Sequence, residues 1–327
     1  MALACFVGRG LERAELLATA LDDGRVQLWD TATSTLRHQL TRPTHLAVRW
    51  TSIAAHAGAA GGKVGGGRAG AAVLLALGSD GGVVALWDVQ RAALVHELRA
   101  HSAQVNAVAF GSSGRTLLSA GEDKQVCCWD PVAGTLLQTF KTGKVPVASL
   151  AHGADDAEVL LAATWLRLVR RPPADAAADE ADRWKRLARF PGHASAVSCL
   201  CVSSDGAFAL SNADDRHVSL WRLRDQHGAL VTQEKGGAPA SAAGTLSLAH
   251  RVTQLCFRAA PPAATNGGAA AHSPEYAFCA VTADGSARVW RFGGGARAKK
   301  RKGSKKGEEN GTADALLGAT PACVLRV

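Results

Sequence analysis

Short runs of alternating apolar and polar residues follow one another along most of the chain, separated by turn-forming Gly, Asp, Ser and Pro. Typical runs near the start are ELLATA, VQLWD and TLRHQL. Runs of this kind, bounded by such turns, favour β-strands. The pattern therefore predicts an all-β chain of short strands joined by tight turns.

The pattern is most regular in residues 192–221, GHASAVSCLCVSSDGAFALSNADDRHVSLW, and residues 100–129 repeat its order. In both copies His precedes Val by four residues, Ser precedes Asp by four, and Asp precedes Trp by six. The matching positions are His101, Ser119, Asp123 and Trp129 in one copy and His193, Ser211, Asp215 and Trp221 in the other. This order and spacing are the signature of a WD repeat, whose unit is a four-stranded blade.

The four polar positions have a structural logic. An Asp in the turn accepts hydrogen bonds from the turn and from the His, while Ser links the His to the Trp indole. We therefore predict two complete structural tetrads that tie the loop entering a blade to its inner strands.

Incomplete copies of the tetrad occur in three further units. The partial positions are Thr19, Asp23 and Trp29 in the first unit, Trp87 in the second, and Asp284 and Trp290 in the sixth. In the second unit Gly81 occupies the Asp position, and Asp80 is shifted by one. In the sixth, Ala280 replaces Ser and His250 lies two residues before Val252, so no complete tetrad is assigned there.

The fourth unit is inferred mainly from spacing. No Trp closes its third strand-like run, LRLVRR, and Trp165 is displaced from the repeat position. Trp221 follows Trp129 by 92 residues, two periods of 46, and a WD blade takes roughly 40–45 residues. One irregular blade is therefore expected between the two complete ones.

Six such units predict a WD40-type β-propeller, because stacked blades bury both faces of sheets that could not be stable alone. Two β-sandwiches would not explain a Trp at the same place in most units. The predicted propeller covers residues 1–296, followed by a basic flexible tract at 297–313 and a final strand within 314–327. The expected blades are at about 1–42, 43–99, 100–141, 142–190, 191–234 and 245–327. Since these propellers usually have seven blades, we expect the last blade to be missing from this chain.

The second unit contains a Gly/Ala-rich stretch, AHAGAAGGKVGGGRAGA, at residues 55–71, after a first strand at about 47–54. Such a stretch buries too little to hold one shape. It is predicted to be a loop on the rim of the propeller.

The composition is 47% hydrophobic and 20% charged, with neither an apolar run long enough for a membrane span nor a signal-peptide pattern. The eight cysteines form no CxxC pair, and most lie in strand-like runs such as VCCW and SCLCV. We expect reduced, buried cysteines, with no metal and no cofactor.

The net charge of +9 is concentrated in one place, since seven positive charges lie in the tract ARAKKRKGSKK. The candidate residues for nuclear targeting or RNA contact are Lys299, Lys300, Arg301, Lys302, Lys305 and Lys306. Exposed basic runs serve as import signals and contact phosphates without sequence preference, and the alternative is a plain solvated loop. The rest of the chain is close to neutral.

The combination of His, Ser and Asp also suggests a hydrolase triad. Here the trio recurs once per unit together with a Trp, as a structural network would. The sequence contains no GxSxG, HExxH or Walker-type motif. We therefore predict no catalytic residues and no small-molecule substrate.

Beyond the generic repeat, the chain resembles the N-terminal propeller of the Utp-five/WD-repeat-forty-three family, a nucleolar component of the small-subunit processome. The similarity lies in GRVQLWDTATSTLRHQL followed by THL, in the insertion before LLALGSDGGVVALWDVQRAALVHEL, in the irregular blade before FPGHASAVSCL, and in the basic tract after VWRF. The family also carries a C-terminal helical assembly domain, and we expect that segment to be missing from this chain.

The resemblance implies a non-catalytic scaffold in the nucleolus that acts in pre-18S rRNA processing, rDNA transcription and ribosome biogenesis. The implied partners are other protein subunits of a large ribonucleoprotein assembly and pre-rRNA, without a membrane. The alternatives are a WD-repeat partner of an RNA-modifying enzyme such as a tRNA methyltransferase, and a general WD-repeat protein-interaction adaptor. A cytoplasmic substrate receptor or trafficking adaptor is a third alternative.

Overall fold

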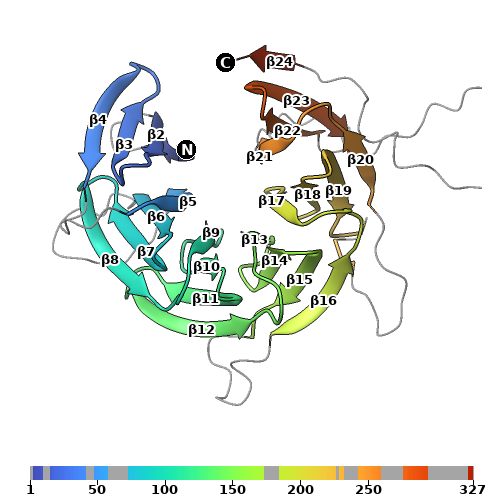
Figure 1. The fold of residues 1–327 in the computed structure, drawn as a ribbon, viewed down its shortest axis with the longest axis horizontal. Helices are drawn as coiled ribbons and strands as arrows, with labels where there is room; N and C mark the ends of the chain where they lie inside the picture. The colour runs from blue at the N-terminus through green and yellow to red at the C-terminus, as the bar shows by residue number, and fades with distance from the viewer. Residues whose placement is uncertain are drawn as a thin grey trace, which may run out of the picture. The chain divides into compact units, whose positions relative to one another are not determined.

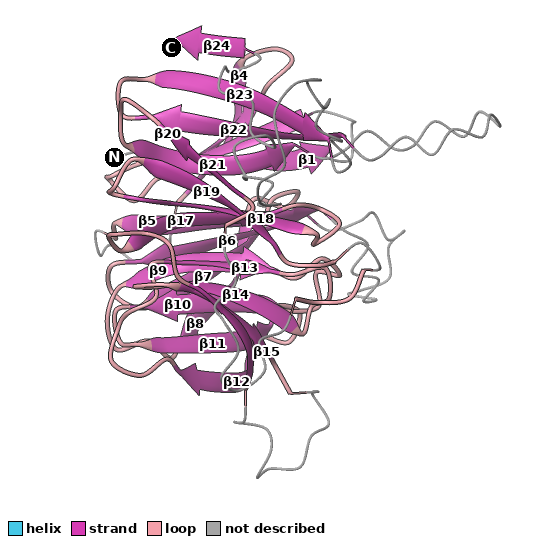
Figure 2. Ribbon diagram, turned by 90° about the vertical axis from the view of Figure 1, so that its right-hand side faces the viewer, coloured by secondary structure: helices cyan, strands magenta, loops and turns pink. Residues whose placement is uncertain are grey.

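The computed structural model describes residues 3–9, 15–41, 48–57, 73–172, 184–225, 228–231, 242–258, 275–293 and 323–326. Within these ranges the chain forms strands and loops without a helix (Figure 2). The strands make six four-stranded sheets, which we call blades one to six in chain order (Figure 1). In blades one, two, three, five and six all three pairings of neighbouring strands are antiparallel, and the first two strands of blade four also pair antiparallel.

The first three blades follow the predicted units. Blade one contains β1 (Leu3–Arg9), β2 (Glu15–Ala20), β3 (Val26–Asp30) and β4 (Thr35–Leu40). Blade two contains β5 (Trp50–Ala57), β6 (Val73–Ser79), β7 (Val83–Asp88) and β8 (Ala93–Arg99). Blade three contains β9 (Val105–Phe110), β10 (Leu117–Gly121), β11 (Gln125–Asp130) and β12 (Thr135–Lys141).

The later blades include the irregular one. Blade four contains β13 (Ser149–His152), β14 (Glu158–Ala162), β15 (Leu166–Arg170) and β16 (Lys185–Phe190). Blade five contains β17 (Val197–Val202), β18 (Phe208–Ala213), β19 (His217–Arg222) and β20 (Gly244–Ser247). Blade six contains β21 (Val252–Arg258), β22 (Glu275–Thr282), β23 (Ser286–Gly293) and β24 (Cys323–Arg326).

One predicted boundary was wrong. The first strand of blade two runs to Ala57, because residues 55–57 pair with residues 73–75 of β6. The small Ala side chains had suggested a loop, but strand pairing supplies the hydrogen bonds that composition alone does not indicate. The remainder of the predicted loop, residues 58–71, lies outside the described residues.

In blades two to five the second strand is the most deeply buried. All residues of β6, β10, β14 and β18 are buried, whereas the outermost strands β4, β8 and β12 are largely exposed. Apolar side chains of neighbouring blades pack together between sheets, as Leu28 does with Leu75, and Leu220 with Phe278. Burial on both faces explains why these strands are continuous apolar runs.

The chain divides into two compact units, Met1–Ala163 with Val169–Lys185, and Thr164–Leu168 with Arg186–Val327. Blades one to three lie in the first unit, and blades five and six lie in the second. The complete tetrads thus belong to separate units, one in each.

Candidate functional site

In blade three the structure brings the four predicted tetrad residues together. His101 Nδ1 lies 2.9 Å from Asp123 Oδ2, and His101 Nε2 lies 2.8 Å from Ser119 Oγ. Trp129 Nε1 donates a hydrogen bond of 2.8 Å to the same Ser119 oxygen. Because the indole can only donate, the Ser119 hydroxyl hydrogen is available to the His101 ring. The network therefore joins the entry loop to the second and third strands of the blade.

Asp123 also holds the backbone of two loops. Its carboxylate accepts hydrogen bonds from the backbone N–H of Ser102 at 3.1 Å and of Gln125 at 3.2 Å. The first of these belongs to the loop that enters the blade, and the second is the first residue of β11, directly after the turn that holds Asp123. One buried carboxylate thus fixes both loops at the same edge of the sheet.

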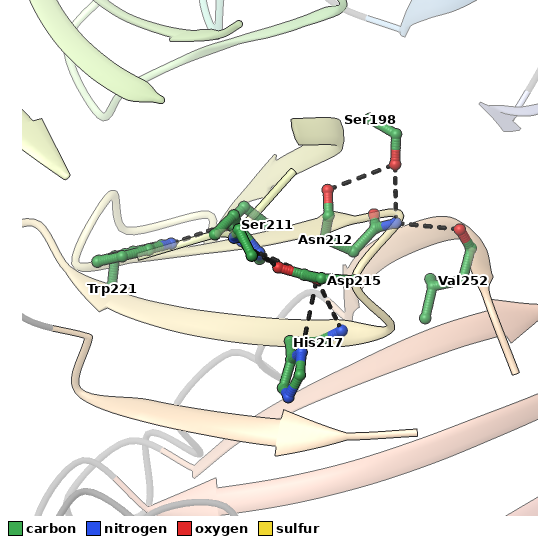
Figure 3. Close-up of polar contacts among 9 residues, drawn as sticks. Ser198, Ser211, Asn212, Asp215, His217, Trp221 and Val252 are labelled. Atoms are coloured by element: carbon green, nitrogen blue, oxygen red, sulfur yellow. Dashed lines mark hydrogen bonds and ion pairs between the residues drawn. The ribbon is translucent and has the colours of Figure 1, made fainter. Parts of the chain in front are cut away.

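Blade five has the same arrangement. His193 lies 3.1 Å from Asp215 Oδ2 and 2.8 Å from Ser211 Oγ, and Trp221 Nε1 donates to Ser211 at 2.7 Å. Figure 3 shows the Trp221 indole directed at Ser211, and Asp215 directed at His217. Burial by itself would raise the pKa of Asp215, but hydrogen bonds from His217, the Ala194 N–H and His193 hold that pKa below its ordinary value.

The burial of the tetrads decides what chemistry they can perform. Ser119 and Ser211 are each 0% exposed, and both hydroxyls lie between a His ring and a Trp indole. A nucleophilic Ser must reach a substrate carbonyl, which neither position allows. The geometry is that of a structural network.

The partial sets show what happens when the Ser position changes. In blade one Thr19 replaces Ser, and its hydroxyl accepts a 3.0 Å hydrogen bond from Trp29 Nε1. In blades two and six the corresponding residues are Leu77 and Ala280. There the buried indole nitrogens have no hydrogen-bond partner among the described residues, namely Trp87 Nε1 and Trp290 Nε1. The repeat keeps the Trp even where its polar partner is lost.

The turns of the partial sets use different side chains. In blade one Asp23 accepts hydrogen bonds from the backbone and the guanidinium of Arg25. In blade two neither Gly81 nor Asp80 closes the turn, because Ser79 Oγ bonds both the N–H and the carbonyl of Val83. Sequence reasoning missed Ser79, whose position two residues after the Ser site of the tetrad was the available signal.

Blade six keeps part of the tetrad. His250 Nε2 lies 3.6 Å from Asp284 Oδ2, although the spacing in the sequence did not assign this pair. Asp284 also accepts hydrogen bonds from the Thr282 hydroxyl at 2.5 Å and from the Ser286 N–H at 3.1 Å. These bonds, that of Thr282 first, lower the pKa of Asp284. The His–Asp contact thus survives where the Ser has become Ala280.

Charged residues also link successive blades, between the turn of one blade and the segment that enters the next. Arg251, before blade six, lies 2.8 Å from Asp214 in a turn of blade five. Arg49, before blade two, lies 3.8 Å from Asp22 in the equivalent turn of blade one. Both pairs are exposed, so each contributes little stability.

The two outer strands of blade four are rich in arginine. We call Arg167, Arg186 and Arg189 the blade-four arginine cluster; they come from the neighbouring strands β15 and β16. The guanidinium carbon of Arg189 lies 3.2 Å from the ring centroid of Trp165. Burial, followed by the charges of Arg186 and Arg189, lowers the pKa of Arg167. Such guanidiniums bind phosphate or carboxylate oxygens, and the stacked one is held in place by the indole.

The comparisons with known proteins agree with this geometry. Residues 92–130 and 184–222 match the family model described as WD domain, G-beta repeat. The chain is a WD40-repeat β-propeller protein. Each match spans the outermost strand of one blade and three strands of the next, and it contains one complete tetrad. The predicted fold class is thereby confirmed, with six blades in the described part of the chain.

Individual relatives are distant. Nuclear distribution protein PAC1-2 of Uncinocarpus reesii is 30% identical over 206 residues, which cover 58% of this chain and 41% of the relative. The mouse guanine nucleotide-binding protein subunit beta-like protein 1 is 26% identical, covering 46% of this chain and 44% of the relative. The matched region therefore spans less than half the length of either protein.

A solved structure shows the same fold. A chain in the crystal structure of the mitotic checkpoint complex superimposes with a TM-score of 0.57 at 16% identity, covering 85% of this chain and 73% of that chain. None of these similarities extends to a particular process. What they support for this propeller is the general role of WD repeats, protein interaction within complexes.

The remaining sequence predictions concern other parts of the chain. The six basic tract residues, from Lys299 to Lys306, lie outside the described residues. In the described ranges no group of three or more His, Cys, Asp or Glu side chains is placed to hold a metal ion. The same ranges contain no helix long and apolar enough to cross a membrane.

Proposed function

We propose that this propeller is a non-catalytic scaffold subunit of the nucleolar small-subunit processome, acting in pre-18S rRNA processing, rDNA transcription and ribosome biogenesis. The observation that carries the scaffold role is the use of His, Ser and Asp inside the blades, at Ser119 and Ser211 above all. With these groups committed to the fold, the loops at the blade edges are the surfaces left for partners. The resemblance of the first, second and fourth units, and of the basic tract after VWRF, to the processome family supports the specific assembly.

Two basic regions support contact with RNA. The first is the tract that contains Lys299, Lys300, Arg301 and Lys302. The second is the blade-four arginine cluster, which adds guanidiniums from two strands beside an indole. Basic side chains neutralise backbone phosphates without reading sequence. The proposed partners are therefore protein subunits at the blade edges and pre-rRNA at the basic regions.

The proposed location is the nucleus, and within it the nucleolus. Replacing Lys299, Lys300, Arg301 and Lys302 by Ala removes four positive charges from the tract and is expected to weaken nucleolar accumulation. Fluorescence microscopy of the tagged chain measures this. Replacing Arg91 and Arg99 of blade two by Ala is the control, since both are exposed and pair with acidic neighbours. Equal nucleolar signal for all three chains would remove the import role from the tract.

Affinity purification with mass spectrometry, beside RNA crosslinking, tests the proposed assembly. Recovery of processome subunits and pre-rRNA is the expected result. One-to-one copurification with a methyltransferase, without processome subunits, would instead assign the propeller to an RNA-modifying enzyme. Exclusion from the nucleus, with neither group recovered, would assign it to a cytoplasmic adaptor.

A further inference from the structure

Four cysteines gather on three strands of blades five and six. Cys199 and Cys201 lie on β17, Cys256 lies on β21, and Cys279 lies on β22. The last two are direct register partners in the antiparallel pair of β21 and β22. Directly opposed residues point to the same face, with Cβ atoms about 4.5–5.5 Å apart. The fold thus places Cys256 and Cys279 side by side.

Among these four cysteines Cys256 is exposed, whereas Cys199, Cys201 and Cys279 are half-buried. Burial, with the neighbouring Cys256 thiol, raises the pKa of Cys279. Burial also raises the pKa of Cys199. Oxidants in solution therefore reach Cys256 first, with Cys279 as the adjacent second thiol.

We propose that Cys256 and Cys279 form a thiol–disulfide pair that responds to peroxide. The Cys256 thiolate attacks hydrogen peroxide, an S–O bond forms, the O–O bond breaks, and hydroxide leaves to become water. The Cys279 thiolate then attacks the sulfur of the Cys256 sulfenic acid, an S–S bond forms, the S–O bond breaks, and the leaving hydroxide takes a proton to become the second water. Two thiols lose two electrons and two protons, and one peroxide becomes two waters.

The geometry suits a disulfide at this pair. Opposed Cα atoms on antiparallel strands are about 4.5 or 5.5 Å apart, within the range of about 4.4–6.8 Å that disulfides span. The alternative chemistry for four thiols is metal binding, but the described residues hold no group placed to share an ion. The bond would join the first two strands of blade six, a property independent of the proposed scaffold function.

Tryptic mapping of the full chain tests the proposal. Cleavage separates the two cysteines into single-cysteine peptides, residues 252–258 and 259–288, whereas Cys199 and Cys201 share residues 190–216. After reduction, removal of reductant and addition of equimolar hydrogen peroxide, peptides 252–258 and 259–288 are expected to be recovered as one disulfide-linked species. Dithiothreitol should return both to free thiols.

Single variants separate this pair from its neighbours. Cys201→Ser is the matched control and should keep the linked species. Cys279→Ser should abolish it and leave Cys256 as a sulfenic acid that dimedone labels. Should wild-type protein instead carry overoxidised Cys256 beside an unchanged Cys279 thiol, or link Cys256 to peptide 190–216, the proposed pair would be wrong. Because wild-type mapping is decisive alone, a variant that fails to fold does not weaken the test.

Discussion

At the scale of single residues, one hydroxyl position determines how the closing Trp of a blade is held. In blade five Ser211 serves Trp221 and His193 together. In blade six the equivalent Ala280 leaves the indole of Trp290 without a partner among the described residues. A buried donor without an acceptor costs about 1–3 kcal/mol. The contribution of this hydroxyl to stability can therefore be measured in two ways. It can be removed from blade five, at Ser211, and added to blade six, at Ala280.

Removing the hydroxyl is expected to destabilise blade five. Ser211→Ala should lower the free energy of unfolding by about 1–3 kcal/mol, because a buried indole N–H and imidazole lose their shared partner. Urea denaturation followed by tryptophan fluorescence measures the loss. Ser247→Ala, at an exposed position of β20 in the same blade, should change stability by less than about 0.5 kcal/mol. Equal losses for the two variants would contradict the network.

Adding the hydroxyl is expected to stabilise blade six. Ala280→Ser places an acceptor ten residues before Trp290, the spacing found in both complete tetrads. The gain in the free energy of unfolding should be about 0.5–1.5 kcal/mol. Ala277→Ser, a half-buried position on the same strand, is the control. A lower urea midpoint for Ala280→Ser than for wild type would show that the blade cannot use the added group.

At the scale of elements, polar side chains near the starts of strands form hydrogen bonds to neighbouring blades. Asn106 donates to the carbonyl of Val147 at 3.0 Å, and Tyr276 donates to Asp205 at 2.6 Å. These contacts join the start of β9 to the approach to β13, and β22 to a turn of blade five. His152, the last residue of β13, is instead buried with both ring nitrogens unpartnered among the described residues. A buried imidazole without a partner makes the packing around it sensitive to protonation, because burial disfavours the charged form.

Acid is expected to weaken the fold through His152. Burial lowers its pKa from 6.5 to about 4, with Asp156 opposing the shift and Arg171 adding to it. The unfolded chain therefore binds this proton first, and stability falls as the pH drops from about 6.5 toward 4. Between pH 7 and pH 4.5 the loss from this group should be about 2–3 kcal/mol.

The contribution of His152 is measured as a difference. Urea midpoints of wild type and His152→Leu, recorded at both pH values, cancel the carboxylates that titrate in the same range. The variant should lose less stability on acidification than wild type. Identical pH dependence for the two chains would assign the acid sensitivity to other groups.

At the scale of the whole molecule, the net charge of +9 conceals an uneven distribution. Outside the basic tract the chain is close to neutral, yet Arg167, Arg186 and Arg189 interact in one blade. Like charges held together favour an anionic partner, and the field of several arginines extends over about a Debye length. The net charge of the whole chain therefore does not show where an anionic partner would bind, whereas the charge of blade four does.

Arg167→Ala with Arg186→Ala is expected to weaken binding of single-stranded RNA and to reduce its salt dependence. Each lost phosphate contact should lower the slope of log affinity against log salt by about 0.7. Fluorescence anisotropy with labelled oligouridine at several salt concentrations measures both quantities. The control replaces Arg91 and Arg99, the ion-paired arginines of blade two. A control that weakens binding as much as the double variant would leave the cluster without a specific role.

The sequence by itself determined the blade order and the members of both complete tetrads, such as Ser119 and Trp129. Those features depend on turn chemistry and on spacing within one sheet, which follow from the chain locally. Only the tertiary structure decided that His250 meets Asp284 and that Cys256 lies opposite Cys279. The reason is physical: contacts across strands depend on register and packing, and a shift of one residue reverses the face on which a side chain lies.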